Sequence, residues 1–93
     1  MPSKPVVVAS TSGLHARPAK IFTLAAKEAG LPVTVSFNGR TVNAASILSI
    51  MSLGVDKGHE VIVGIDDDEG DPDQVQAALD RLVSLLELDL DTV

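Results

Sequence analysis

The dipeptide Asn38-Gly39 constrains the fold of this chain more than any other feature, because Asn-Gly is the strongest two-residue signal for a β-hairpin. Before it, Val33–Phe37 alternates apolar and polar side chains, and after it Arg40–Asn43 returns as a second strand. Pairing across a two-residue turn sets Val35 opposite Val42. One face of this hairpin is therefore apolar, and it requires a core to cover it.

Strand and helix patterns alternate along the rest of the chain. Residues 4–9 are rich in β-branched side chains, and residues 60–65 place three apolar side chains on one face. Apolar side chains recur at helical spacing over residues 16–29, 47–53 and 72–87. The order is strand, helix, strand, strand, helix, strand, helix. Because strands so few and so one-sided cannot be covered on both faces, we predict an α+β fold, a four-stranded antiparallel sheet with three helices packed on one face.

The composition limits the class of protein. The length fits one domain over residues 1–93, and 45% hydrophobic with 22% charged residues is typical of a globular chain. A net charge of −6 with seven scattered basic residues argues against nucleic-acid binding. Because there is no cysteine and the two histidines have no ligand spacing, we expect no metal and no cofactor. No apolar run approaches the ~18 residues of a membrane span, so we expect a cytoplasmic monomer that does not enter membranes.

The segment Gly13-Leu-His-Ala-Arg-Pro-Ala19 stands where the first strand gives way to the first helix. The first N–H groups of a helix have no intrahelical acceptor and lie at the positive end of its dipole, so this place suits a phosphate. Neutral imidazole is a nucleophile for phosphoryl transfer, which makes His15 the candidate carrier. The backbone of Ala16 and Arg17 and the planar guanidinium of Arg17 are candidates for holding the phosphate.

The same segment also has a plainer interpretation. A histidine at a helix start is more often a cap or a surface residue. Pro18 leaves open which of residues 15–17 caps the helix, because the residue before a proline is biased away from helical angles.

This segment resembles the active-site signature of the HPr family, the histidine-containing phosphocarriers of the bacterial phosphoenolpyruvate-dependent sugar phosphotransferase system. A second stretch, Ser46-Ile-Leu-Ser-Ile-Met-Ser-Leu-Gly54, resembles the other signature of the family, and the resemblance extends over essentially the whole chain. It implies an open-faced β-sandwich. It also implies that His15 takes a phosphoryl group on Nδ1 from phosphorylated enzyme I and passes it to sugar-specific enzyme IIA components for sugar uptake. Such a protein is a phosphoryl carrier rather than an enzyme.

The second signature also contains apolar side chains without an evident core position. Ile47, Ile50 and Leu53 can face the core, which leaves Leu48 and Met51 for the surface unless the helix is buried all round. Methionine suits a surface that accepts several partners. We therefore predict a partner-binding surface, the docking patch, with a basic edge for an acidic partner. Its residues are Ala16, Lys20, Ile21, Leu24, Lys27, Ile47, Leu48 and Met51.

Ser46 matches the position that a dedicated HPr kinase phosphorylates in many relatives, so the resemblance implies possible regulation there. A phosphate would place about two negative charges beside the docking patch and disfavour docking. The alternative is that Ser46 is only a helix cap. The pair Ala44-Ala45 also stands where kinase-regulated relatives tend to carry a lysine, which puts this regulatory role in doubt.

Two other functions stay open at this point. One is a carrier in a parallel, non-sugar phosphorelay that regulates rather than transports. The other is a ferredoxin-like domain that binds a small regulatory ligand, since that fold has a similar element order. We interpret His59 as a solvated turn residue, residues 66–73 as a solvated acidic loop with a helix cap, and residues 88–93 as a frayed tail.

Overall fold

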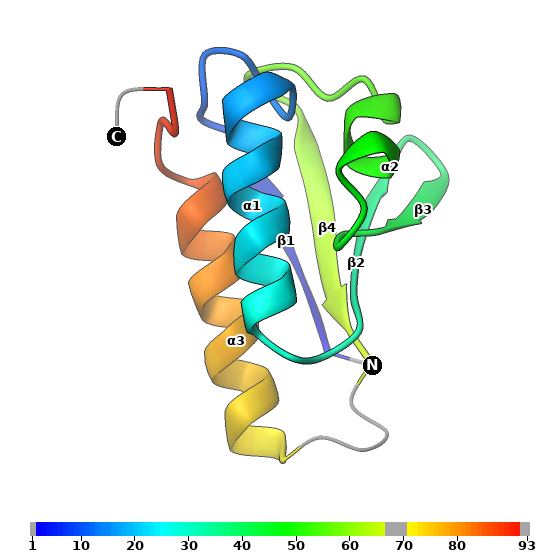
Figure 1. The fold of residues 1–93 in the computed structure, drawn as a ribbon, viewed down its shortest axis with the longest axis vertical. Helices are drawn as coiled ribbons and strands as arrows, with labels where there is room; N and C mark the ends of the chain where they lie inside the picture. The colour runs from blue at the N-terminus through cyan, green and yellow to red at the C-terminus, as the bar shows by residue number, and fades with distance from the viewer. Residues whose placement is uncertain (1, 67–70, 92–93) are drawn as a thin grey trace.

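The computed structural model describes residues 2–66 and 71–91. Within them the chain forms the predicted order of strands and helices (Figure 1). The elements are β1 Ser3–Val7, α1 Ala16–Glu28, β2 Val33–Phe37, β3 Arg40–Asn43, α2 Ile47–Ser52, β4 Glu60–Ile65 and α3 Pro72–Leu86. The prediction of an α+β fold is confirmed. None of the described helices is long and apolar enough to cross a membrane.

The four described strands form one antiparallel sheet in the order β1-β4-β2-β3. The hairpin has the predicted register, with Val35 opposite Val42 across Asn38 and Gly39. Both turn residues have positive φ, 52° and 82°, as an Asn-Gly turn of this kind requires. Because β4 lies between β1 and β2, the last strand in sequence joins the first strand to the hairpin.

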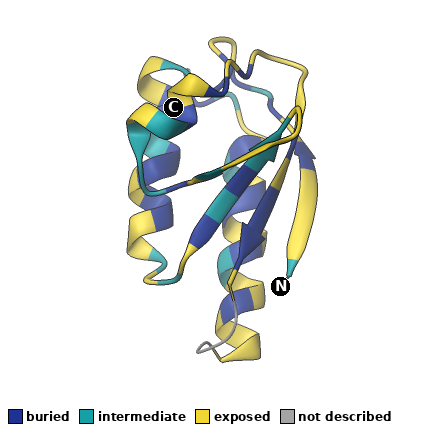
Figure 2. Cartoon of the chain, turned by 90° about the vertical axis from the view of Figure 1, so that its right-hand side faces the viewer, coloured by how far each residue is buried: buried dark blue, intermediate teal, exposed yellow. Residues whose placement is uncertain are grey.

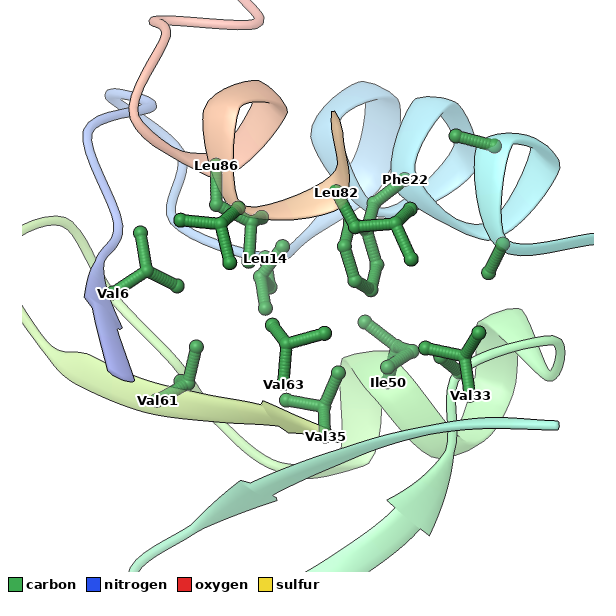
Figure 3. Packing of buried hydrophobic residues seen from close by; sticks show 14 of the residues in the cluster. Val6, Leu14, Phe22, Val33, Val35, Ile50, Val61, Val63, Leu82 and Leu86 are labelled. Atoms are coloured by element: carbon green, nitrogen blue, oxygen red, sulfur yellow. The ribbon is translucent and has the colours of Figure 1, made fainter. Parts of the chain in front are cut away.

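The core lies between one face of the sheet and the helices. The inward side chains of β4, such as Val63, meet Phe22 from α1, Leu82 from α3 and Ile50 from α2 (Figure 3). Buried residues line the boundary between helices and sheet, while the outward turns of the helices are exposed (Figure 2). The opposite face of the sheet is open, and Ile62 is 45% exposed there. The fold is therefore an open-faced sandwich.

The first strand ends sooner than the sequence suggests. Its pattern runs through residues 4–9, but β1 stops at Val7. Val8 still donates its N–H to the carbonyl of His59, which lies opposite it in the β1–β4 register, at 2.9 Å. The Ala9 N–H instead donates to the Leu86 carbonyl at 3.0 Å. The chain thus leaves the sheet early and passes over the end of α3.

The prediction of a frayed tail is wrong for residues 88–91, which we call the strap; residues 92–93 lie outside the described residues. The Ser10 hydroxyl donates to the Leu88 carbonyl at 3.2 Å and accepts from the Leu90 N–H at 2.9 Å. Leu90 is only 1% exposed, and burying such a side chain stabilises by about 1.5–3 kcal/mol. The strap is held because it completes the core and satisfies a buried hydroxyl.

Substitution of two isoleucines on opposite faces of β4 tests which face of the sheet packs on the helices. Ile65→Ala removes a fully buried side chain and should lower the free energy of unfolding by about 2–5 kcal/mol, because it leaves a cavity. Ile62→Ala makes the same chemical change on the open face and should cost under about 1 kcal/mol. Urea denaturation of both variants measures the difference. Equal losses of stability would contradict the assignment of faces.

Candidate functional site

His15 is the N-cap of α1, so it is the one of residues 15–17 that caps the helix. Its backbone is extended, with φ −119° and ψ 161°, and its side chain makes no capping hydrogen bond. The imidazole is thus not used to satisfy the helix, and its side chain is 37% exposed. The N–H groups that an α-helix cannot use internally begin with that of Ala16, directly beside this ring. The predicted juxtaposition of an imidazole with a helix mouth is present.

Ala16 has φ 49°, in the left-handed region that residues with a Cβ seldom occupy. Such a conformation costs an alanine about 1–2 kcal/mol relative to the right-handed one. Packing on both sides must hold it, since the preceding Leu14 is fully buried and the following Pro18 and Ala19 are buried as well.

The segment before His15 is packed against the loop between α2 and β4. Leu14 donates its N–H to the Val55 carbonyl at 3.0 Å. Gly13 has φ 65°, and a Cβ there would lie against the Val55 carbonyl oxygen and 2.6 Å from Asp56 Cα. Only glycine allows this approach. The two loops run together at the same end of the molecule as the start of α1 (Figure 1).

That loop also supplies a side chain to the site. Asp56 Oδ1 lies 3.5 Å from His15 Nε2. The Asp56 N–H donates to His59 Nδ1 at 3.0 Å, and the His59 ring stacks on Phe37 with centroids 5.1 Å apart. His59 is exposed, as predicted for a turn residue, but it also supports the position of Asp56. This role cannot be predicted from the sequence, because nothing in the spacing links residues 15, 56 and 59.

On its other side the segment before His15 is bound by the strap. Thr11 donates its N–H and its hydroxyl to the Asp89 carboxylate, at 3.2 and 3.0 Å. Ser12 does the same to the Asp91 carboxylate, at 2.7 and 2.8 Å. The partners are 78 and 79 residues apart in the chain. Two acidic side chains near the C-terminus thus hold the loop that leads to His15.

Most residues of the predicted docking patch lie around one groove. A groove of ≈ 520 Å³ lies between α1 and α2. All of the predicted patch residues except Lys27 and Leu48 line it, and Arg17 lines it as well. Lys27 is exposed further along α1, and Leu48 is 78% exposed on α2. Because Leu48 and Met51 are exposed, the alternative of a helix buried all round is wrong.

Ser46 is the N-cap of α2, and its hydroxyl accepts from the Ser49 N–H at 3.3 Å. The capping role considered for it is therefore present. Ile50 and Leu53 face the core as predicted, while Ile47 is partly buried and also reaches the groove. Of the acidic loop, residues 67–70 lie outside the described residues.

The fold and the site define a small open-faced sandwich that presents a histidine at a helix start beside an apolar groove. The family model for the "PTS HPr component phosphorylation site" matches residues 2–87. The chain is 41% identical over 87 residues to the phosphocarrier protein HPr of Streptomyces coelicolor, covering 92% of this chain and 88% of that one. The chain belongs to the HPr family of phosphocarriers.

Solved structures agree with this assignment. HPr-C-His from Thermoanaerobacter tengcongensis superposes with a TM-score of 0.77 at 32% identity, covering 96% of this chain and 99% of that one. Crh, a catabolite repression protein of Bacillus subtilis described as a swapped dimer, superposes with a TM-score of 0.71 at 34% identity. The coverage is 96% of this chain and 97% of that one. The resemblance noted in the sequence is thereby confirmed.

Acidification should weaken the hydrogen bonds that join Thr11 to Asp89. The Thr11 N–H, helped by the Asp91 N–H and the Thr11 hydroxyl, holds the pKa of the Asp89 carboxyl below its ordinary value. Folding lowers the pKa of this carboxyl, so its charged form stabilises the folded chain at any pH above the unfolded pKa of about 4. This stabilisation is lost as the pH falls through the pKa of the folded state. The Thr11 amide proton shift, followed by NMR, should therefore titrate below about pH 4.

Asp89→Asn is the control for this titration, because asparagine keeps an acceptor oxygen for the Thr11 N–H but has no proton to gain. The Thr11 shift should then lose this acid transition. A transition that is unchanged in the variant, or that lies above the ordinary carboxyl range, would contradict the assignment.

Proposed function

We propose that this chain is a phosphocarrier that accepts a phosphoryl group on His15 from phosphorylated enzyme I and passes it to enzyme IIA components for sugar uptake. The observation that carries the proposal is the position of His15, at the N-cap of α1 with an imidazole that does not cap the helix. Membership in the HPr family supports the same role.

The chemistry needs few groups. His15 Nδ1 attacks the phosphorus, the bond to the donor breaks, and the electron pair of that bond stays with the donor. Charge on the transferring group is carried mainly by its oxygens, so positioning and electrostatic stabilisation do most of the catalysis. The Ala16 and Arg17 backbone N–H groups and the Arg17 guanidinium are the donors that we assign to these oxygens. In this mechanism the chain is a protein substrate in a relay rather than an enzyme, and it uses no cofactor.

The docking patch is the surface that we assign to enzyme I and enzyme IIA. It combines exposed apolar side chains, Leu24, Leu48 and Met51, with the cations Lys20 and Lys27. Apolar anchors supply affinity at such surfaces, and the positive rim selects an acidic partner and speeds encounter. Because Ala16 lines the groove, a partner seated there lies next to the residue that follows His15.

Location, assembly and regulation follow from the same proposal. The carrier is expected to act in the cytoplasm as a monomer, although an HPr dimer from Thermoanaerobacter tengcongensis is among the similar structures, with a TM-score of 0.61. Phosphorylation of Ser46 by an HPr kinase stays a prediction, since its hydroxyl has a structural use as a cap.

A regulatory phosphorelay is the second candidate function. The similarity to Crh, a protein named for catabolite repression, favours it. Transfer assays against enzyme IIA components of sugar and non-sugar systems separate it from the first candidate. The third alternative, a ferredoxin-like domain for a small ligand, has no support from the family or from the similar structures.

Labelling with phosphoenolpyruvate and enzyme I tests the main proposal. The chain should acquire an acid-labile, base-stable phosphate, and His15→Ala should abolish it. Arg17→Ala should slow transfer about 10- to 100-fold, since a charged hydrogen bond contributes about 1.5–3 kcal/mol. Arg81→Ala, which removes a surface arginine paired with Glu28 on the far end of α1, is the matched control. Undiminished labelling of His15→Ala would refute the proposal.

A charge placed on the docking patch should weaken the interaction with partners. Leu48 is 78% exposed, so Leu48→Glu leaves the core intact while adding a negative charge where an acidic partner is expected. We expect the KM for this chain as a substrate of enzyme I to rise at least about 5-fold. Ile62→Glu adds the same charge on the open face of the sheet and should leave KM unchanged. Equal effects of the two variants would place the docking surface elsewhere.

A further inference from the structure

Asp56 is the acidic side chain that the structure brings to His15. Its Oδ1 lies 3.5 Å from His15 Nε2, and the two side chains are 70% and 37% exposed. The contact is made to one specific ring nitrogen. The negative charge of a carboxylate close to Nε2 favours a hydrogen on that nitrogen, and so the ring tautomer in which Nδ1 carries the lone pair.

The backbone of Asp56 is held in place by the neighbouring residues. Its N–H donates to His59 Nδ1 at 3.0 Å, and its carbonyl accepts from the His59 N–H at 3.1 Å. His59 is in turn held by stacking on Phe37. On the other side, the Val55 carbonyl accepts from the Leu14 N–H at 3.0 Å, one residue before His15. The loop that carries Asp56 is therefore fastened both to the sheet and to the segment that carries His15.

The geometry points to Asp56 as a positioning residue for phosphoryl transfer at His15, with His59 holding Asp56 in place through its Nδ1 acceptor. This inference rests on the proposed function and adds to it two side chains outside the signature around His15. Both act through His15 and touch neither the donor nor the phosphoryl group.

The proton balance explains what Asp56 contributes. With the hydrogen on Nε2, beside the carboxylate, Nδ1 attacks phosphorus and forms the N–P bond without losing a proton. Nε2 keeps its hydrogen, so the phosphorylated ring carries a positive charge, and the Asp56 carboxylate compensates this charge as it develops. When the group moves on to the next acceptor, the N–P bond breaks, its electron pair returns to Nδ1, and the ring is again neutral with Nε2–H.

The expected size of the effect follows from the exposure of the pair. An ion pair this open to water gives a modest coupling, so removal of the carboxylate should slow phosphorylation about 2- to 5-fold rather than abolish it. The effect should be larger on the phosphorylated ring, which is charged, than on the neutral ring.

The test combines a spectroscopic and a kinetic measurement on the full chain. Imidazole 15N shifts report the His15 tautomer without any partner, and phosphorylation by phosphoenolpyruvate and enzyme I gives the rate. Asp56→Ala should lower the share of the Nε2–H tautomer and slow phosphorylation about 2- to 5-fold. Asp56→Asn keeps an acceptor oxygen but removes the charge. The share of the Nε2–H tautomer should therefore fall less than in Asp56→Ala, while phosphorylation should still be slowed. Asp80→Asn, which removes an exposed carboxylate paired with Lys4 on the outer side of α3, is the control.

His59 is tested by a conservative rescue. His59→Ala removes the acceptor for the Asp56 N–H and should reproduce part of the Asp56→Ala effect, whereas His59→Asn restores an acceptor and should recover the wild-type tautomer. If Asp56→Ala matches Asp80→Asn in both tautomer and rate, the inference is overturned. Failure of the wild-type chain to be phosphorylated would instead refute the proposed function, and the tautomer measurement separates the two cases because it needs no enzyme I.

Discussion

The close approach of Gly13 to the backbone of Val55 and Asp56 is the contact on which the site depends. It is possible only without a Cβ, and it joins the loop after β1 to the loop before β4. The buried Leu14 then fixes the chain one residue before His15, with its N–H bound to Val55. The partly exposed His15 side chain is thus carried on backbone that is anchored in the core by the preceding residue.

The strap gives the same loop a second anchorage. Thr11 and Ser12 each bind a carboxylate through both backbone and side chain, and Ser10 is buried beneath the strap. The loop that leads to His15 is therefore held on one side by the loop before β4 and on the other side by the strap. The loop contacts therefore fix the position of His15, while the groove between α1 and α2 stays open to solvent.

Local features of the sequence predicted the fold well because each depends on neighbouring residues. The Asn38-Gly39 turn determined the hairpin register, and alternation along β4 identified the face that packs on the helices. The position of His15 at a helix start could also be predicted, although the actual cap could not. The strap and the contact between Asp56 and His15 could not be predicted, for one common reason. Their contacts join residues about 40 to 80 positions apart, and helical or strand periodicity carries no information about such pairs.

The central claim is that His15 carries a phosphoryl group on Nδ1. The most direct measurement is NMR of the 15N-labelled chain after phosphorylation by phosphoenolpyruvate and enzyme I, in which phosphorus coupling identifies the nitrogen that bears the group. We predict a single phosphohistidine at position 15, bonded through Nδ1. A phosphate on His59, on Nε2 of His15 or on a serine hydroxyl would contradict the account.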